Sequence, residues 1–530
     1  MLCCLIMKMK NINEASRLLA LAIREQQRIL IVGDFDADGA TSTALAIRAL
    51  RSFGAKHVSY LVPNRFEYGY GLTPELVAEA CKSKPDLIIT VDNGIANHAG
   101  VLAAKKAGIQ VLVTDHHLPA PTLPLADVIV NPNQPDDHFK SKQLAGVGVI
   151  FYVMLALRRY LLDQGWFASE KLPEPNMSKL LDLVALGTVA DLVQLDQNNR
   201  VLVHQGLLRI KAGQCVPGII ALLECAGRNH SRIVAADLGF AVGARLNAAG
   251  RLDNMSLGIE CLLCDDSVQV RQVAQTLDQL NCERKVIEHD MQTQAMSVLS
   301  QLNAQEIEAL KGISLYDESW HQGVIGILAA RIKDRYHRPV IVFAPSTQDE
   351  LKGSARSIPN LHIRDVLAFI DTQFPNLIKK FGGHAMAAGL TIHPSQFPTF
   401  QTVFNDIVAA KLTEDDLKHA IWSDGELTKD ELSLELASLL RDAGPWGQAF
   451  PEPMFDDIFR IVEQRIVGDK HLKLRLAKDG RMIDAIAFFV DEKKWPNHRC
   501  EKIHAAYRLD INEYNGKRQV QLILDCMEPV

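Results

Sequence analysis

The sequence lacks any apolar run that is long enough to cross a membrane. A membrane-spanning helix needs about 18 or more consecutive apolar residues, and no such run occurs among the 530 residues. The apolar start, residues 1–7, is also far shorter than the hydrophobic region and cleavage site of a secretory signal. We therefore predict a protein without a membrane segment and expect it in the cytoplasm.

The sequence also lacks the cysteine pattern of a secreted or zinc-binding protein. Its ten cysteines are scattered along the chain, which is typical of proteins kept in a reducing compartment. Cys261 and Cys264 form a single Cys-x-x-Cys pair, but no second pair completes a structural zinc site. A disulfide-stabilised extracellular domain and a zinc finger are both disfavoured.

Neither a strong charge of one sign nor a P-loop is present. The net charge is −6, so the protein is not coated in basic surface, although a local nucleic-acid groove is compatible with this balance. No Gly-Lys-Ser/Thr follows the glycines of the first strand-to-helix turn. The P-loop explanation of that turn is therefore excluded.

Strand and helix patterns alternate in the first part of the chain. Five short β-rich runs are separated by stretches with helical apolar spacing. The strands are expected at 28–32, 57–62, 86–91, 110–114 and 127–130. This order predicts an α/β fold with a parallel, doubly wound sheet, and the length predicts several domains.

Composition shifts suggest the remaining domain boundaries. A more helical region ends the first domain at about residue 255. The stretch 259–311 contains no Gly or Pro and predicts a connecting helix, assigned to 256–311. If most of the stretch is helical, it could span roughly 60 to 70 Å. A second α/β domain is expected at 312–412 and a linker at 413–454. The tail, 455–530, has about five short strand patterns and a hairpin turn at Asn515-Gly516, typical of an OB-like barrel.

Acidic and imidazole side chains follow three strands of the predicted sheet. They are Asp34, Asp36 and Asp38 after the first strand, Asp92 after the third, and Asp115, His116 and His117 after the fourth. Because ligands of open α/β sheets bind outside the carboxyl ends of the strands, these side chains are expected at one rim. One aspartate alone could equally be a helix N-cap or an Asx-turn, but three strand ends together favour a site.

The chemistry of this rim indicates metal ions. Like charges gathered in one place repel one another unless a cation neutralises them. Oxygen-rich sites with one or two imidazoles suit Mn²⁺ or Mg²⁺ better than zinc. The carboxylates outnumber the needs of one divalent ion, so we predict two ions that share a bridging acid.

Four short motifs resemble those of the DHH phosphoesterase superfamily. They are Asp36-Ala-Asp38-Gly, Asp92-Asn-Gly, Asp115-His-His and Ala185-Leu-Gly-Thr-Val-Ala-Asp191. Longer segments that begin at Pro63, Arg245, Trp320 and Gly382 are similar to the branch of the superfamily that degrades single-stranded DNA. The resemblance begins near Asn11. Residues 1–10 do not resemble the helical turns with which the family begins, which would fit a truncated amino terminus or a mis-assigned start codon.

The resemblance implies an activity and a set of domains. It implies a DHH catalytic domain at 1–255, a DHH-associated domain that binds phosphate and DNA at 312–412, and a nucleic-acid-binding barrel at 455–530. The implied activity is metal-dependent hydrolysis of single-stranded DNA from the 5′ end to 5′-mononucleotides, in DNA repair and recombination. Implied partners are single-strand-binding protein and a helicase, and a monomer suffices.

The resemblance also assigns site residues. The implied metal ligands are Asp34, Asp36, Asp38, Asp92, His116 and Asp191, with Asp92 as the bridging carboxylate. The implied catalytic residues are Asp92, His116, His117 and Arg251. The implied substrate-binding residues are Arg65, Arg245, Asn247, Arg251, His321, Ser354, Arg356, Gly383 and His384. Of these, Arg245, Asn247 and Arg251 are expected on a loop between helices, where they could also cap a helix end.

Two other functions stay open at this point. Other DHH phosphoesterases act on oligoribonucleotides or cyclic dinucleotides, but they are shorter and lack the OB-like tail. A non-catalytic scaffold of the same fold could bind DNA. Such a scaffold is expected to have lost metal ligands, whereas the acids are all present here.

Overall fold

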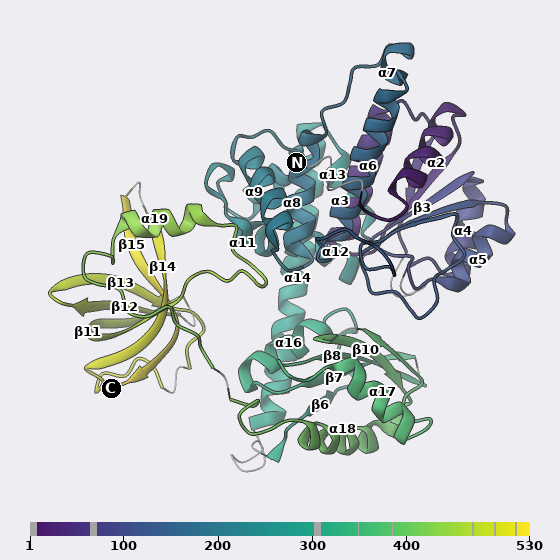
Figure 1. Cartoon of the computed structure of the whole chain (residues 1–530). Coiled ribbons are helices and arrows are strands. Elements are labelled where there is room, and N and C mark those ends of the chain that lie inside the picture. Colours follow the sequence, from purple (N-terminus) through teal and green to yellow (C-terminus); the bar gives the residue numbers. More distant parts are fainter. Residues whose placement is uncertain are drawn as a thin grey trace. The chain divides into compact units, whose positions relative to one another are not determined.

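The computed structural model describes residues 8–63, 71–300, 309–347, 349–383, 385–418, 420–468, 471–491, 494–514 and 517–530. Its contacts divide the chain into two compact units. One runs to Asp278 and resumes at Ile421–Val530, and the other is Gln279–Ala420. The first unit contains a parallel sheet and a closed barrel, and the second contains a mixed sheet (Figure 1).

The parallel sheet confirms the predicted doubly wound α/β fold. Its strands are β1 (Ile29–Val32), β2 (Val58–Leu61), β3 (Leu87–Val91), β4 (Gln110–Thr114) and β5 (Val128–Val130). They lie in the order β2-β1-β3-β4-β5, and every neighbouring pair is parallel. β1 and β3 are buried along their whole length, which explains why they are continuous apolar runs.

Helices cover both faces of this sheet. On one face, apolar side chains of α4 (Pro74–Ala80) and α5 (His98–Lys106) share a core with alternate strand residues such as Val32 and Val111. On the other face pack α2 (Ile12–Arg24), α3 (Ala37–Ser52) and α6 (Gly146–Asp163). The carboxyl ends of β1, β3 and β4 therefore open at one rim.

A group of shorter helices completes the first part of the chain. They are α7 (Trp166–Ser169), α8 (Leu181–Ala190), α9 (Gln197–Lys211), α10 (Pro217–Cys225), α11 (Ala235–Asp237), a π-helix (Leu238–Gly243), α12 (Ala244–Leu252) and α13 (Ser256–Leu263), with 3-10 turns at Cys81–Ser83, Met177–Leu180 and His230–Arg232. The expected loop that carries Arg245, Asn247 and Arg251 is instead the helix α12. Its alanines, leucines and arginines are strong helix formers, which explains the difference.

The long connecting helix is present but starts later than expected, and the residues expected to continue it at 301–308 lie outside the described residues. α14 (Ser267–Ser300) has 34 residues, about 50 Å at 1.5 Å per residue. The break from α13 falls at Asp266, whose carboxylate accepts hydrogen bonds from the amides of Val268 and Gln269 and so caps the new helix. Among the described helices, none combines the length and the apolar content that a membrane crossing needs.

The second unit is a five-stranded mixed sheet with helices. Its elements are β6 (Ile313–Tyr316), α16 (Ile325–Tyr336), β7 (Val340–Thr347), β8 (Glu350–Arg356), α17 (Ile363–Gln373), β9 (Lys380–Gly383), β10 (Ala387–Ile392), a 3-10 turn (Pro394–Gln396) and α18 (Phe397–Lys411). The strand order is β6-β7-β8-β10-β9. β6 pairs with β7 in parallel, and the other pairs are antiparallel.

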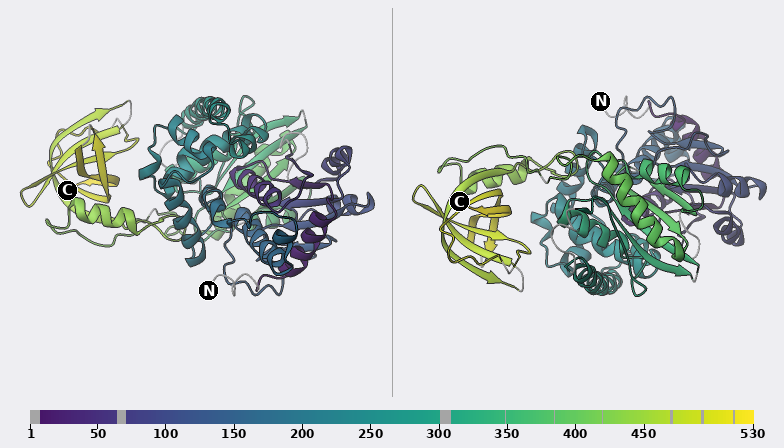
Figure 2. Two further views of the ribbon diagram at one scale, coloured as in Figure 1. Left: turned by 90° about the horizontal axis from the view of Figure 1, so that it is seen from above. Right: turned by 90° about the horizontal axis from the view of Figure 1, so that it is seen from below.

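The tail forms the expected five-stranded closed barrel (Figure 2). Its strands are β11 (Phe455–Val467), β12 (His471–Lys478), β13 (Arg481–Ala487), β14 (Lys502–Tyr514) and β15 (Lys517–Pro529). β14 and β15 are antiparallel neighbours, and the hairpin turn expected at residues 515–516 lies outside the described residues. The segment expected to be a linker contains a helix, α19 (Leu434–Ala443), which packs on β14 and β15.

Candidate active site

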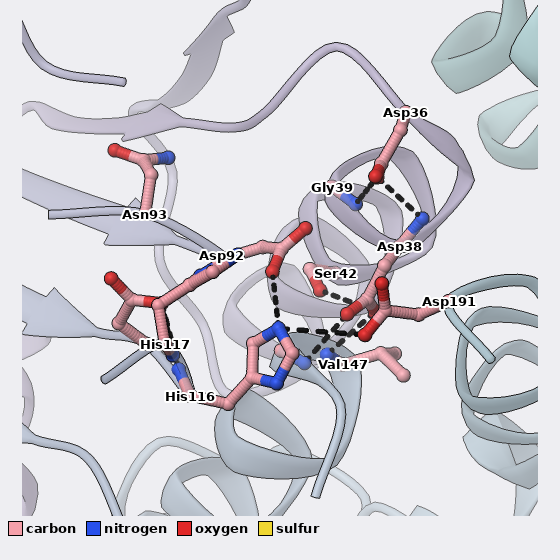
Figure 3. A network of polar contacts seen from close by, with 12 residues as sticks. Asp36, Asp38, Gly39, Ser42, Asp92, Asn93, His116, His117, Val147 and Asp191 are labelled. Carbon is pink, nitrogen blue, oxygen red and sulfur yellow. Dashed lines mark hydrogen bonds and ion pairs between the residues drawn. The ribbon is translucent and has the colours of Figure 1, made fainter. Parts of the chain in front are cut away.

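The predicted acidic and imidazole side chains meet at the open rim of the parallel sheet (Figure 3). His116, which follows β4, lies at the centre: its Nε2 is 3.1 Å from Asp92 Oδ1 and 3.5 Å from Asp191 Oδ2. Asp92 follows β3, and Asp191 follows α8. Segments that are far apart in the sequence therefore deliver their polar groups to one place.

The structure makes compatible two roles that the sequence left as alternatives for Asp36, helix N-cap and metal ligand. It is the N-cap of α3, and its Oδ1 accepts hydrogen bonds from the amides of Asp38 (2.9 Å) and Gly39 (3.0 Å). These bonds fix the orientation of the carboxylate. They also leave the other oxygen available to the site, so a capping role and a ligand role are compatible.

Asp38 is held by the amino terminus of α6. Its two carboxylate oxygens accept hydrogen bonds from the amides of Gly146 (2.6 Å) and Val147 (2.9 Å), and Ala145 provides no side-chain cap for that helix. The sequence analysis did not find this contact. A signal was available, because an alanine is a poor N-cap for a helix as deeply buried as α6.

Asp92 is in a conformation that few non-glycine residues adopt. Its φ is 63°, which is the left-handed region and is costly for a residue with a Cβ. The side chain is 2% exposed, and Gly146 packs so closely on it that a Cβ at Gly146 would lie 2.6 Å from Asp92 Cβ. The backbone and the neighbouring helix therefore direct this carboxylate into the cluster.

Asp115 and His117 form a separate charged pair beside the cluster. His117 Nδ1 donates to Asp115 Oδ1 at 2.8 Å, and Asp115 Oδ2 accepts from the amide of Ile95. Burial lowers the pKa of His117, but the charge and hydrogen bond of Asp115 outweigh it and raise that pKa to about 9. Burial raises the pKa of Asp115, but the charge and hydrogen bond of His117 outweigh burial and lower that pKa to about 2. His117 is therefore a cation at neutral pH.

The carboxylates of the cluster resist ionisation without a cation. Burial, followed by the charge of Asp191, raises the pKa of Asp38 to about 7, and burial, followed by Asp36, raises the pKa of Asp191 to about 8. Burial and the charge of Asp38 raise the pKa of Asp92 well above its usual value. Burial lowers the pKa of His116, so its imidazole is neutral. Neutral imidazole is the metal-binding form.

The donor set fits two divalent ions. Three groups have ligand atoms within 4.8 Å of one another: Asp92, His116 and His117; Asp38, His116 and Asp191; and Asp34, Asp36 and Asp92. Asp92 and His116 each belong to two groups. His116 Nε2 is buried but makes no hydrogen bond, which is costly unless an ion satisfies it. Carboxylate oxygens with one or two imidazoles suit Mn²⁺ or Mg²⁺.

The predicted substrate-binding residues of α12 contact the protein itself. Arg245 is 8% exposed; its guanidinium pairs with Asp278 at 2.7 Å and donates to the Ala241 carbonyl. Asn247 Oδ1 accepts a hydrogen bond from the amide of Ala37 at 2.8 Å. Both side chains are therefore held by contacts within the protein, and their contact with the substrate stays a prediction. A substrate contact by Arg251 stays a prediction.

Several predicted substrate-binding residues gather in the second unit. Arg356 donates to Ser354 Oγ (3.2 Å) and to the Ala355 carbonyl. The Gly326 backbone, in the first turn of α16, approaches both side chains: a Cβ there would lie 2.9 Å from Arg356 Nη2 and 3.0 Å from Ser354 Oγ. α16 has no side-chain cap. A helix amino terminus beside a guanidinium and a hydroxyl suits a phosphate.

The other predicted substrate-binding residues of the second unit make contacts within the protein or lie outside the described residues. His321 Nδ1 accepts a hydrogen bond from the amide of Gly323, just before α16, and its contact with the substrate stays a prediction. Gly383 has φ 141° and packs on β10, since a Cβ there would lie 2.4 Å from Ala388 Cα. Arg65 and His384 lie outside the described residues.

Three protein-family models match the chain. The DHH family N-terminal domain matches residues 28–188, the DHHA1 domain matches 309–410, and the RecJ OB domain matches 423–525. Together they cover the sheet with the acidic rim, the mixed sheet and the barrel.

Relatives and solved structures match along nearly the whole chain. The single-stranded-DNA-specific exonuclease RecJ of Dickeya dadantii is 55% identical over 522 residues, which is 98% of this chain and 91% of that protein. The same exonuclease of Escherichia coli is 53% identical over 525 residues, 99% of this chain and 91% of that protein. The crystal structure of RecJ in complex with Mn²⁺ from Thermus thermophilus superimposes with a TM-score of 0.81 at 30% identity, covering 98% of this chain and 72% of that one. This chain therefore belongs to the RecJ family of single-stranded-DNA-specific exonucleases, within the DHH superfamily.

Proposed function

We propose that this protein hydrolyses single-stranded DNA with two divalent metal ions, starting at the 5′ end and releasing 5′-mononucleotides. The buried cluster around His116 carries this proposal, because its carboxylates and neutral imidazole fit Mn²⁺ or Mg²⁺. The relatives at 55% and 53% identity are named single-stranded-DNA-specific exonucleases. We also propose a role in DNA repair and recombination.

The residues in and beside the cluster have different roles in the reaction. The metal-holding residues are Asp34, Asp36, Asp38, Asp92, His116 and Asp191. Bound divalent ions supply Lewis-acid stabilisation of the phosphate and a water of lowered pKa. Asp92 is the best candidate for a carboxylate shared by two ions, because it lies in one group with Asp34 and Asp36 and its Oδ1 is 3.1 Å from His116 Nε2, which lies in the group of Asp38 and Asp191. His117, a cation fixed by Asp115, faces the scissile phosphate and offsets its charge.

The group formed by Ser354, Arg356 and the start of α16 supports the 5′ polarity. Burial lowers the pKa of Arg356, and no carboxylate contributes to that shift, so among the described residues this guanidinium lacks an acidic partner. A partly buried cation of this kind is stabilised by an anion. A terminal 5′-phosphate provides that anion, and its extra charge distinguishes a phosphorylated end from the interior of a strand.

The cellular setting rests on weaker observations. Eight cysteines of the described residues are free, which supports a reducing cytoplasm. We propose that the enzyme acts there as a monomer, together with single-strand-binding protein and a helicase that supplies unpaired strands. The barrel supports a nucleic-acid partner, because OB-type barrels bind single strands.

A labelled-DNA assay with two site variants tests the proposal. Single- and double-stranded DNA with 5′ or 3′ label is incubated with Mn²⁺ or Mg²⁺. We expect early release of the 5′ label as mononucleotide from single strands only. Asp92→Asn should lower the rate about 10³-fold or more, because it removes a shared metal ligand. The matched control, Asp163→Asn, removes an exposed carboxylate of α6 and should leave the rate unchanged.

The 5′-phosphate contact has its own comparison. Arg356→Ala should raise the KM for 5′-phosphorylated strands while the KM for 5′-hydroxyl strands stays the same. Early release of the 3′ label, equal cutting of duplex, or full activity of Asp92→Asn would contradict the proposal. Preferential hydrolysis of oligoribonucleotides or cyclic dinucleotides would favour the other phosphoesterase function. DNA binding without hydrolysis would favour the scaffold.

A further inference from the structure

Helix α12 packs directly against the segment that carries Asp36 and Asp38. Asn247 Oδ1 accepts a hydrogen bond from the amide of Ala37, the residue between the two aspartates, at 2.8 Å. One turn later, Gly250 lies so close that a Cβ there would be 1.8 Å from the Phe35 carbonyl oxygen. Helix α12 therefore contacts the backbone on both sides of Asp36, at Phe35 and at Ala37.

The hydrogen bond that Asn247 accepts satisfies a further amide at the amino terminus of α3. The first amides of a helix have no acceptor within the helix. Here the amides of Asp38 and Gly39 are satisfied by Asp36 Oδ1, and the amide of Ala37 is satisfied by Asn247. Ala37 is 1% exposed, so water is a poor substitute for this acceptor.

Helix α12 is itself firmly anchored. Arg245, two residues before Asn247, is buried and pairs with Asp278 at 2.7 Å. Its Nη1 also donates to the Ala241 carbonyl at 2.7 Å, in the preceding π-helix. The side chain of Asn247 thus projects from a helix whose position is fixed independently of the metal site.

We infer that Asn247 is a positioning residue of the metal centre, where the sequence had suggested a substrate contact. Its acceptor oxygen holds the Ala37 amide and thereby sets the distance between the carboxylates of Asp36 and Asp38. Without the acceptor, the first turn of α3 is free to shift, and both carboxylates shift with it. The inference rests on the proposed function only in that divalent ions bind at these carboxylates.

Two isosteric variants separate the acceptor from the shape of the side chain. Asn247→Leu keeps the shape and removes the acceptor, whereas Asn247→Asp keeps both. Mn²⁺ binding to the whole protein, without DNA, is measured from the electron paramagnetic resonance signal of free Mn²⁺. We expect Asn247→Leu to weaken Mn²⁺ binding roughly tenfold, because the buried amide of Ala37 loses the side-chain oxygen that accepts its hydrogen bond. Asn247→Asp should bind Mn²⁺ close to the wild-type level.

Hydrolysis measured over a range of Mn²⁺ concentrations supplies the second readout. A positioning role predicts that Asn247→Leu raises the Mn²⁺ concentration for half-maximal rate and leaves the KM for DNA unchanged. Unaltered Mn²⁺ binding would overturn the inference, as would a raised KM with normal metal dependence, which is the signature of a substrate contact. If Asn247→Leu fails to fold by circular dichroism, the smaller Asn247→Ala takes its place. If the wild type does not hydrolyse DNA, the proposed function is rejected, but the comparison of Mn²⁺ binding still tests the role of Asn247.

Discussion

The two adjacent histidines after β4 have opposite protonation states. Burial and the nearby cation of His117 lower the pKa of His116, whereas the pair with Asp115 raises the pKa of His117 to about 9 despite burial. Their rings are close, with centroids 4.5 Å apart. A neutral imidazole can bind a metal ion and an imidazolium can face a phosphate, so one dipeptide supplies both kinds of group.

The stability of the metal-free protein should fall as pH rises from about 4 to 8. The folded-state pKa values of Asp38 and Asp191, about 7 and about 8, lie above the unfolded value of about 3.9. Folding therefore favours the protonated carboxyls, and their contribution is lost as pH rises through the folded pKa values. Thermal unfolding in a chelator should give a lower Tm at pH 8 than at pH 5.5. His117 acts in the same direction above pH ~6.5, because its pKa is raised.

Metal ions should reverse this trend. Mn²⁺ needs ionised carboxylates, so its binding releases protons and its stabilising effect grows with pH. Asp191→Asn removes one ionisable carboxyl from the cluster. In chelator, the Tm of this variant should therefore decline less between pH 5.5 and pH 8 than the Tm of the wild type. A Tm in chelator that rises between pH 5.5 and pH 8 would contradict the repulsion on which the metal assignment depends.

At the scale of elements, the amino terminus of α6 determines the shape of the metal site. Gly146→Ala places a Cβ 2.6 Å from Asp92 Cβ and 2.8 Å from Asp92 Oδ1, and neither group has room to move. We expect loss of Mn²⁺ binding and at least about 10²-fold lower activity, since small displacements in a metal site are costly. Calorimetric Mn²⁺ titration measures the effect.

Gly148→Ala is the matched control on the same helix. A Cβ there would meet only the side chain of Leu144, at 3.0 Å, which can adjust. Replacing a helical glycine also gains about 0.5–1 kcal/mol of stability. Normal Mn²⁺ binding is therefore expected, and equal damage by both variants would show that α6 tolerates no methyl group, independently of Asp92.

The sequence predicts those elements whose signals are local. The strands of the parallel sheet are mostly apolar runs, three of which precede acids, and the expected start of each strand is within about one residue of its observed start. The break at Asp266 in the long helix was missed, because a mid-sequence aspartate in a stretch without Gly or Pro gives no strong stop signal. α19 was missed because it is short and is held by the barrel strands.

The parts of the site that were missed depend on tertiary contacts. The carboxyl ends of parallel strands converge by geometry, so the acids could be grouped from the sequence. In contrast, Gly146 contacts Asp38 and Asp92, which lie 108 and 54 residues earlier in the sequence. The periodicity of apolar residues cannot predict a contact between such distant residues. The arginine and asparagine of α12 carry phosphate-binding chemistry, but their neighbours Asp278 and Ala37 determine what they bind.

On the scale of the whole molecule, separate cores predict unfolding in steps. The second unit has its own core, with residues such as Phe343, Phe400 and Phe404, and the parallel sheet has another. Mn²⁺ binds only folded protein at the acidic rim, so it raises the stability of the first unit. In differential scanning calorimetry we expect Mn²⁺ to move the transition of that unit upward and to leave the transition of residues 279–420 in place. A single transition that moves as a whole would indicate that α14 couples the two units.

The hydrogen bonds from α6 to Asp38 also bear on how this enzyme could change over evolutionary time. α6 is an 18-residue helix with most of its side chains buried, and its first amides depend on this one carboxylate. Loss of His116 would abolish metal binding but leave the starts of α3 and α6 capped, whereas loss of Asp38 would remove the acceptor of the first amides of the buried helix α6. A descendant that no longer catalyses the reaction but keeps the fold is therefore expected to lose His116 before Asp38, and to retain Asp38 for the stability of α6.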